Sequence, residues 1–240
     1  MKRETMNRVL LLIALAAGAS SLLVGCGTSR GYKQADKTGE GIASFREEIL
    51  NGKKAIDQTM AALSQIQASA ATDPRKAFED YSKAVANLES TAEKARKRAA
   101  AMREQGKAYF DAWEKQLAEV KNPEIQQMAQ QRKQKLQTAF DNIKHVSEPL
   151  KQQFDPWMSD LKDLDKYLGS DLTVNGVDAA KPLFKKTLDG GKEVQKSMDA
   201  LIAELNTISA TLTAAKVQPQ PAPEGKEVTP SGQQPPPASK

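Results

Sequence analysis

The sequence predicts an all-α protein, namely an elongated antiparallel helical bundle or coiled coil of about four long helices with disordered ends. Apolar residues make up 39% of the chain, aromatic residues only 5% and charged residues 27%, which favours long helices with a narrow apolar stripe over a thick globular core. Along most of the chain the apolar residues recur alternately three and four positions apart. This is the heptad spacing of helices that pack against one another.

Residues 1–25 have the composition of a secretory signal peptide. Lys2, Arg3 and Arg8 precede an uncharged run from Val9 to Gly25 that is rich in Leu and Ala. The run is shorter than the roughly 20 residues of a typical membrane-spanning helix. A basic start, a short apolar run and small residues at its end are typical of secretory signals.

The run ends in Leu-Val-Gly-Cys26, and Cys26 is the only cysteine of the chain. This ending resembles the signal of bacterial lipoproteins, which implies cleavage before Cys26 and attachment there of a diacylglycerol and an acyl chain such as palmitate. Gly27 stands where that class carries Asp for retention in the inner membrane. We therefore expect a membrane anchor at Cys26, in the outer membrane and facing the periplasm. An uncleaved membrane anchor with an incidental thiol is the alternative.

Residues 26–41 are expected to form a lipidated flexible tether, because Gly27 to Gly41 includes four glycines and no apolar period. The helical domain is expected over residues 42–215. Its first helix covers about 42–70, with apolar positions at Ile42, Phe45, Ile49, Ile56, Leu63 and Ile66. Asp73-Pro74 then suits an N-cap followed by a first helical position, which predicts that a second helix starts there.

The second helix is expected from about residue 75 to 122 without an internal proline, a rod of roughly 70 Å at 1.5 Å per residue. The middle of its apolar stripe consists of the small residues Ala92, Ala95, Ala99 and Gly106. Small side chains predict a close approach of neighbouring helix axes at that level.

Asn122-Pro123 repeats the cap signature and predicts that a third helix runs antiparallel to the second. Its apolar spacing keeps phase across Pro149 and Pro156, which predicts one kinked helix rather than two. A loop is expected over residues 169–178, with Asp178 capping a fourth helix that Gly190-Gly191 could bend. Residues 216–240 hold seven of the twelve prolines and are expected to form a Pro-rich disordered tail.

Tyr109 to Glu114 reads Tyr-Phe-Asp-Ala-Trp-Glu and is followed by Asn122-Pro123-Glu124. These motifs resemble an uncharacterised family of bacterial envelope lipoproteins that is described only as a domain of unknown function. The resemblance covers roughly residues 32–212 and implies a coiled-coil lipoprotein, but it supplies no activity and no binding residues. Tyr109, Trp113 and Trp157 lie on the apolar stripes and are expected in the core, whereas Phe110 lies off the stripe and should face another helix or a partner.

No catalytic residue, metal ligand or cofactor is expected, and the protein is not predicted to be an enzyme. Nucleophilic and zinc chemistry require clusters of His or Cys, and the chain has one His, His145. Asp160, Asp163 and Asp165 flank apolar stripe positions, which is typical of a solvated helix face. No glycine-rich phosphate loop or dinucleotide fingerprint is present in the sequence.

A basic run in the second helix is the strongest candidate for a binding surface. It comprises Lys94, Arg96, Lys97, Arg98, Arg103 and Lys107, opposed in that window only by Glu93 and Glu104. Arg132, Lys133 and Lys135 could continue it on the third helix. Such a face suits anionic lipid or another anionic polymer of the envelope; a solvated face kept basic for solubility is the alternative. Nucleic acid is not an expected partner of an exported, lipid-anchored chain.

The function expected from these features is that of a structural scaffold or adaptor, which would present helical surfaces to envelope proteins. The alternative is a module that binds peptidoglycan or anionic lipid through the basic face or the Pro-rich tail. An accessory subunit of a secretion or efflux assembly is a third hypothesis. The heptad stripes can close within one chain or between copies, so a homo-oligomer is also possible.

Overall fold

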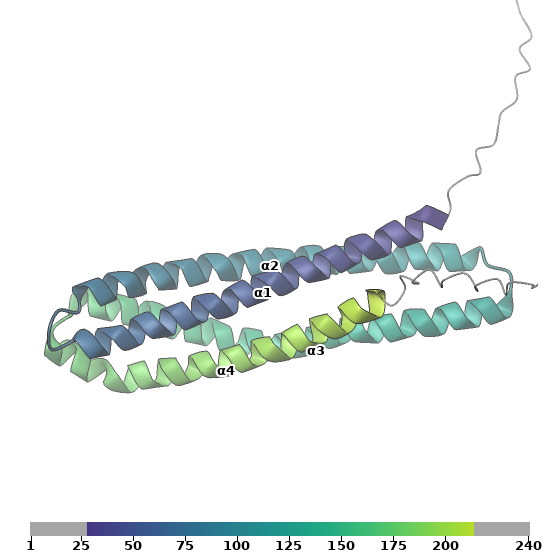
Figure 1. Ribbon diagram of the computed structural model, residues 1–240. Coiled ribbons are helices and arrows are strands. Elements are labelled where there is room, and N and C mark those ends of the chain that lie inside the picture. The colour runs from purple at the N-terminus through teal and green to yellow at the C-terminus, as the bar shows by residue number, and fades with distance from the viewer. Residues whose placement is uncertain (1–27, 214–240) are drawn as a thin grey trace, which may run out of the picture.

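A computed structural model describes residues 28–213, and Figure 1 shows them as a bundle of long helices. The described residues form four helices and no strand: α1 (Thr28–Ser69), α2 (Arg75–Ala118), α3 (Pro123–Ser170) and α4 (Val174–Thr213). The helices contain 42, 44, 48 and 40 residues, hence about 60–70 Å each at 1.5 Å per residue. The predicted fold class, an elongated antiparallel helical bundle of four helices, is confirmed.

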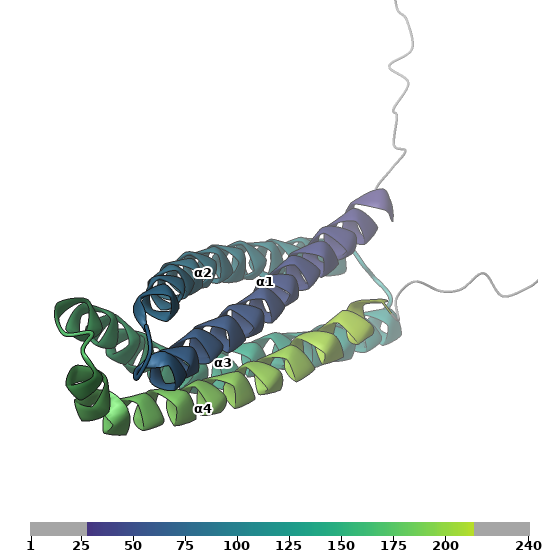
Figure 2. The ribbon, with the colours of Figure 1, turned by 60° about the vertical axis from the view of Figure 1, so that its left-hand side comes forward.

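The helices run alternately up and down, and each packs against its two neighbours around the bundle. Figure 2 shows α1 running between α2 and α4. The pairing of α1 with α2 is the most extensive, followed by α3 with α4 and by α1 with α4, whereas α2 and α3 make the sparsest contact. The short connection at Asn122-Pro123 does make α2 and α3 antiparallel neighbours, but they stay apart along much of their length.

The core is a single stripe of apolar side chains that follows the predicted heptad positions. Its largest fully buried members come from all four helices and include Ile56, Tyr81, Leu161 and Phe184. The Tyr81 hydroxyl donates a hydrogen bond to the Leu161 carbonyl at 2.8 Å, and burial raises the pKa of this phenol well above its ordinary value. Trp157, 4% exposed, donates from its indole nitrogen to the Thr187 carbonyl at 2.7 Å, which ties α3 to α4.

The expected flexible tether over residues 26–41 is wrong for its described part, because α1 already begins at Thr28. Thr38 is fully buried, and its hydroxyl donates to the Gln34 carbonyl at 2.8 Å. Packing against α2 therefore supports helix here, although Gly39 and Gly41 disfavour it. The remaining expectations at the chain ends, the signal peptide 1–25, the anchor at Cys26 and the tail 216–240, lie outside the described residues.

The predicted start of α3 is confirmed, while the predicted start of α4 is wrong. The Asn122 side chain accepts hydrogen bonds from the backbone N–H groups of Glu124 and Ile125, as an N-cap does. The loop before α4 is limited to residues 171–173. Thr173 precedes α4 and its hydroxyl accepts from the Gly176 N–H at 3.1 Å, whereas Asp178 forms an ion pair with Lys181.

The prolines and glycines inside the helices do not end them. Pro149 and Pro156 lie within α3 and are exposed, so the carbonyls that they leave without an N–H partner can reach water. Gly190 and Gly191 lie inside α4, where a Cβ atom would stand 2.9 Å from Trp157 Cδ1 and 3.1 Å from Trp157 Cζ2, respectively. These two glycines therefore make room for the indole of Trp157. No helix of the described part is long and apolar enough to cross a membrane.

Candidate functional site

An apolar groove lies between α2 and α3 in the described residues, and we call it the α2–α3 groove. It encloses about 880 Å³, within the range of roughly 300–1,000 Å³ that is typical of ligand sites. On α2 its lining extends from Leu88 to Phe110, and on α3 from Gln137 to Asp155. At 1.5 Å per residue these stretches correspond to about 33 Å and about 27 Å.

Apolar side chains from all four helices form the interior of the α2–α3 groove. The floor is built by α1 and α4 through Phe45, Ile49, Ile56, Met198 and Leu201, and α1 also contributes the half-buried carboxylate of Glu48. The walls carry the remaining apolar residues: Leu88, Ala92, Ala95, Ala99, Met102, Phe110, Phe140, Ile143, Leu150 and Phe154. An elongated interior of this kind suits a long, narrow apolar ligand better than a compact polar one.

Aromatic side chains and one ion pair bridge α2 and α3 toward the two ends of the groove, although the α2 lining continues past Arg96 to Leu88. At one end Phe110 meets Phe140 edge-on, with ring centroids 5.5 Å apart and an interplanar angle of 84°. At the other end Arg96 bonds to Asp155 at 2.8 Å, and its guanidinium carbon lies 5.8 Å from the centre of the Phe154 ring. These contacts connect α2 and α3 on either side of the open stretch.

The opening follows from small residues on α2 that face larger ones on α3. Ala92, Ala95 and Ala99 are too short to meet α3 across the gap, while Phe140 and Phe154 hold the two helices apart at the ends. No side chain fits at Gly106, since a Cβ atom there would lie 2.7 Å from Phe140 Cε1. The predicted close approach of neighbouring helices is therefore wrong toward α3 at Ala92, Ala95 and Ala99, which line the groove. At Gly106 it holds, because Phe140 of α3 lies directly against the helix there.

The structure divides the six residues of the predicted basic surface into two groups. Arg96, Arg103 and Lys107 line the groove, because spacings of seven and four residues keep them on one side of a helix. The other three residues, Lys94, Lys97 and Arg98, are exposed and lie outside the groove lining. We call these groups the rim cations and the outer cations.

The rim cations differ in their partners. Arg96 is engaged by Asp155, whereas Arg103 and Lys107 form no ion pair among residues 28–213. Across the groove the α3 edge alternates in charge, with the sequence Asp141, Lys144, Glu148, Lys151 and Asp155. The α2 edge is therefore the one that favours an anionic group.

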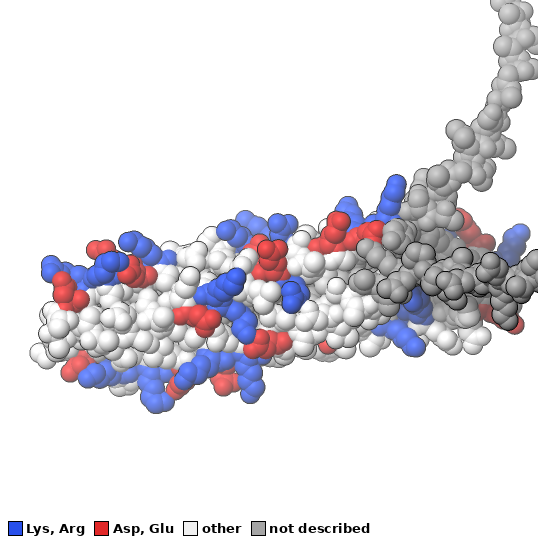
Figure 3. All heavy atoms as spheres, viewed as in Figure 1, with Lys and Arg blue, Asp and Glu red and all other residues white. Residues whose placement is uncertain are grey.

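The α3 residues expected to extend the basic surface do not do so as a group. Lys133 is buried, 7% exposed, and pairs with Glu114, so that its charge is already compensated. Arg132 and Lys135 are exposed. Figure 3 shows the face made by α1 and α4, where basic and acidic side chains are interspersed and no continuous basic surface appears.

The other residues considered in the sequence occupy ordinary structural positions. His145 is exposed on α3. Asp160 pairs with Lys186 at 2.7 Å, Asp163 pairs with Lys166 at 3.2 Å, and Asp165 accepts a hydrogen bond from the Ser82 hydroxyl. Within residues 28–213 no group of three or more His, Cys, Asp or Glu side chains could hold a metal ion.

The aromatic motif in α2 contributes to both the core and the groove. Tyr109 is buried, and this burial raises the pKa of its phenol. Trp113 is half-buried and meets Tyr109 edge-on at 5.5 Å. Phe110, which lies off the apolar stripe of α2, faces α3 and lines the groove.

Comparison with known proteins identifies a family for nearly all of the described residues. The model of a family described as "Protein of unknown function (DUF2959)" matches residues 29–212. Neither a curated protein nor a solved structure matches the chain. The match begins and ends with the four-helix bundle and therefore includes the whole α2–α3 groove.

Proposed function

The chain belongs to the DUF2959 family of unknown function, and we propose that it is a lipid-anchored protein of the cell envelope that binds a long acyl chain with an anionic head group. The α2–α3 groove is the observation that carries this proposal. Its interior is apolar, it is about 27–33 Å long, and Arg103 and Lys107 stand unpaired on its α2 edge within the described residues.

The dimensions of the groove suit an acyl chain. The hydrocarbon core of a bilayer is about 30 Å thick and contains two acyl chains end to end, so the groove accommodates one full chain with space for its head group. Burial of each CH₂ group in such an interior contributes about 0.8 kcal/mol. The apolar interior would thus provide most of the affinity, and the rim cations would select for a negative head group.

The proposed location in the envelope rests on the sequence of the first 26 residues. The basic start, the uncharged run and Cys26 support an anchor at or just before residue 26. Acyl chains on Cys26 would hold the protein on the membrane, because two or more chains give stable anchoring. An anchored binder of this kind works next to the bilayer from which acyl-chain ligands come.

Titration with oleate and with oleyl alcohol tests the proposed ligand class. The two ligands share a hydrocarbon chain, and only oleate carries a charge at neutral pH. We expect the double variant Arg103→Gln/Lys107→Gln to bind oleate about tenfold more weakly, since each lost charge contact contributes roughly 0.5–1 kcal/mol. Its affinity for oleyl alcohol should not change.

The matched control is Lys94→Gln/Arg98→Gln, which removes the same charge from the same helix among the outer cations. We expect this variant to bind oleate like the parent. Equal weakening by both double variants would show that general surface charge, rather than the rim, attracts the ligand. Absence of binding for both oleate and oleyl alcohol would refute the proposal.

A second candidate function is that of a scaffold or adaptor that contacts peptidoglycan or envelope proteins. The exposed outer cations Lys94, Lys97 and Arg98, none of which forms an ion pair in the described residues, favour it. Co-sedimentation with purified peptidoglycan distinguishes this function. Loss of binding on neutralising the outer cations would support it, whereas loss on removal of residues 216–240 would assign the wall contact to the tail.

A further inference from the structure

The connection between α2 and α3 forms the end of the bundle at which α1 begins, and we propose that this end contacts the membrane surface. We call residues 119–129 the hairpin tip. The inference rests on the membrane anchor proposed above and does not depend on the α2–α3 groove. The tip would give the anchored rod a second point of contact with the bilayer.

The hairpin tip projects past the start of α1. The Thr38 hydroxyl lies 3.5 Å from the Gln105 carbonyl, and α1 and α2 are antiparallel. Ten residues toward the start of α1, Thr28 therefore lies beside about residue 115 of α2. From there the chain continues for about eight residues to Pro123, or about 12 Å at helical rise. Figure 1 shows the start of α1 and the α2–α3 connection at the same end of the bundle.

Both interpretations of the N-terminal segment place a bilayer at this end. If Cys26 carries acyl chains, only two residue spacings separate it from Thr28, a span of at most about 7 Å. If the apolar run is instead an uncleaved anchor, it ends at Gly25, and the spacing is nearly the same. The tip, about 12 Å beyond the level of Thr28, can then reach the head groups of the same membrane.

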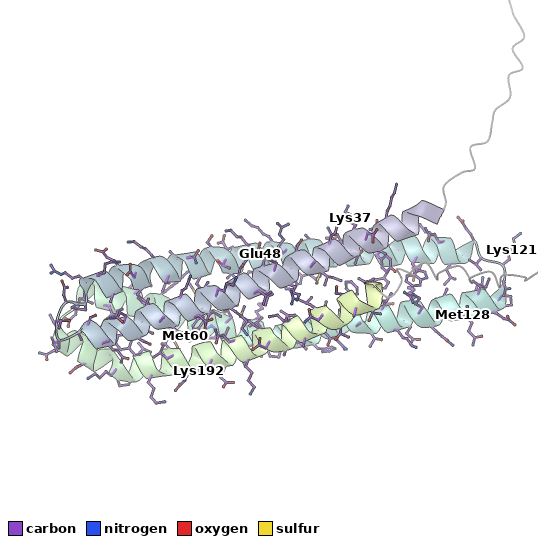
Figure 4. The ribbon with its side chains drawn as sticks, viewed as in Figure 1. Lys37, Glu48, Met60, Lys121, Met128 and Lys192 are labelled. Atoms are coloured by element: carbon purple, nitrogen blue, oxygen red, sulfur yellow. The ribbon has the colours of Figure 1, made fainter. Side chains whose placement is uncertain are left out.

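The surface of the hairpin tip has the chemistry of a membrane contact. Ile125 is 48% exposed and Met128 is 66% exposed, and a spacing of three residues places them on one face of α3. Figure 4 shows Met128 and Lys121 at this end. The two other exposed large hydrophobic residues of the described part, Tyr167 and Val174, lie at the opposite end of the bundle.

The hairpin tip itself carries Lys121 against Glu119 and Glu124, and the basic residues that can face an anionic lipid surface lie on the helices beside it. Between residues 114 and 135 the chain carries five basic residues, at 115, 121, 132, 133 and 135, and three acidic ones, at 114, 119 and 124. The net charge of this region is therefore +2. Basic residues beside exposed apolar ones are typical of segments that lie at the interface of anionic membranes.

The backbone of the tip is already hydrogen-bonded, so it can approach lipid at low cost. The Asn122 side chain accepts from the N–H groups of Glu124 and Ile125, the first at 2.9 Å. The Gln126 side chain donates to the Val120 carbonyl. Backbone N–H and C=O groups without hydrogen-bond partners are unfavourable next to hydrocarbon. The hydrogen bonds of this turn reduce that free-energy cost.

Tryptophan fluorescence of the full chain in vesicles tests the proposal. The chain is reconstituted into phosphatidylcholine–phosphatidylglycerol vesicles that carry brominated acyl chains, which quench nearby tryptophans. Ile125→Trp reports on the tip. Val174→Trp is the matched control, because Val174 is also 48% exposed but lies at the far end. Each variant is compared with the parent, which contains Trp113 and Trp157.

We expect the added tryptophan of Ile125→Trp to be quenched and that of Val174→Trp to be unaffected. Flotation of the protein with the vesicles tests the membrane anchor separately from the contact of the hairpin tip. A chain that floats without quenching of Ile125→Trp, or with equal quenching of Val174→Trp, overturns the tip contact and leaves the anchor standing. A chain that does not float overturns the anchor and with it this inference. Met128→Trp replaces Ile125→Trp if circular dichroism shows that the latter is not helical.

Discussion

Filling the α2–α3 groove with a side chain should stabilise the protein and at the same time weaken ligand binding. Ala99 is half-buried, lines the groove and is one of the small residues that leave it open. The substitution Ala99→Leu places an isobutyl group in the middle of this space. Most substitutions that impair binding also destabilise the fold, so opposite changes in stability and binding would identify the groove specifically.

The size of the stabilisation follows from the apolar surface that the new side chain buries. Leu has three more carbon atoms than Ala, and complete burial at about 0.8 kcal/mol per CH₂ contributes about 2.4 kcal/mol. The site is only partly enclosed, and ordering the Leu side chain costs about 0.5–1 kcal/mol. A net gain of about 1 kcal/mol remains, which raises the melting temperature by roughly 2–4 °C in a domain of this size.

The assay combines thermal unfolding, followed by circular dichroism, with oleate titration of the same samples. Ala100→Leu is the control, since Ala100 is the exposed neighbour of Ala99 on the same helix. We expect Ala99→Leu to unfold at a higher temperature and to bind oleate at least about tenfold more weakly, a difference of 1.4 kcal/mol, and Ala100→Leu to change neither property. Destabilisation by Ala99→Leu would show that the groove has no space there, and unchanged oleate binding would show that the ligand binds elsewhere.

Two further predictions concern the bundle itself. Gly39→Ala and Gly191→Ala make the same substitution in two helices. Gly39→Ala should stabilise the protein by about 0.5–1 kcal/mol, because Ala favours helix more than Gly does and no atom lies within 4 Å of the new Cβ. Gly191→Ala should instead destabilise the protein by about 1–2 kcal/mol, since the new methyl group meets Met60 and Trp157. Denaturant unfolding measures the stability change of both variants. A stabilising Gly191→Ala would contradict the packing described. The second prediction concerns acid stability, because hydrogen bonds from the Arg75 side chain and backbone lower the pKa of Asp73 from 3.8 to about 2. The pKa of Asp73 is lower in the folded than in the unfolded protein, so the stability that its hydrogen bonds with Arg75 contribute is present above about pH 4 and is lost as the pH falls toward 2. Asp73→Asn should therefore flatten the fall in melting temperature between about pH 4 and pH 2. An unchanged profile would count against the Asp73–Arg75 contact.

The helices and their order could be predicted from the sequence because local signals fix them. The heptad spacing marks the buried stripe of each helix, and Asn122-Pro123 combines a side-chain cap with a residue suited to the first helical turn. The start of α1 could not be predicted in this way. Before Ile42 the sequence offers glycines and polar residues, and the helix there depends on contacts with α2, such as that of Thr38 with Gln105.

The groove could be predicted only in part, because its width depends on residues far apart in the sequence. The small residues Ala92, Ala95 and Ala99 are evident in the sequence, but on their own they indicate a close approach of neighbouring helices, unless bulky residues of another helix hold the gap open. Phe140 and Phe154 do so from α3. Spacing alone could not separate the basic residues, since both the rim cations and the outer cations repeat at helical spacing. Which of the two sides of α2 faces α3 depends on the packing of the bundle.

Photo-cross-linking with a diazirine-labelled fatty acid tests most directly whether the α2–α3 groove holds an acyl chain. The reagent reacts with the residues that surround it, and mass spectrometry locates the modified peptides. We predict modification on both walls, between residues 88 and 110 of α2 and between 137 and 155 of α3, and competition by unlabelled oleate. Modification confined to the hairpin tip, or scattered over exposed surfaces without competition, would contradict the proposed site.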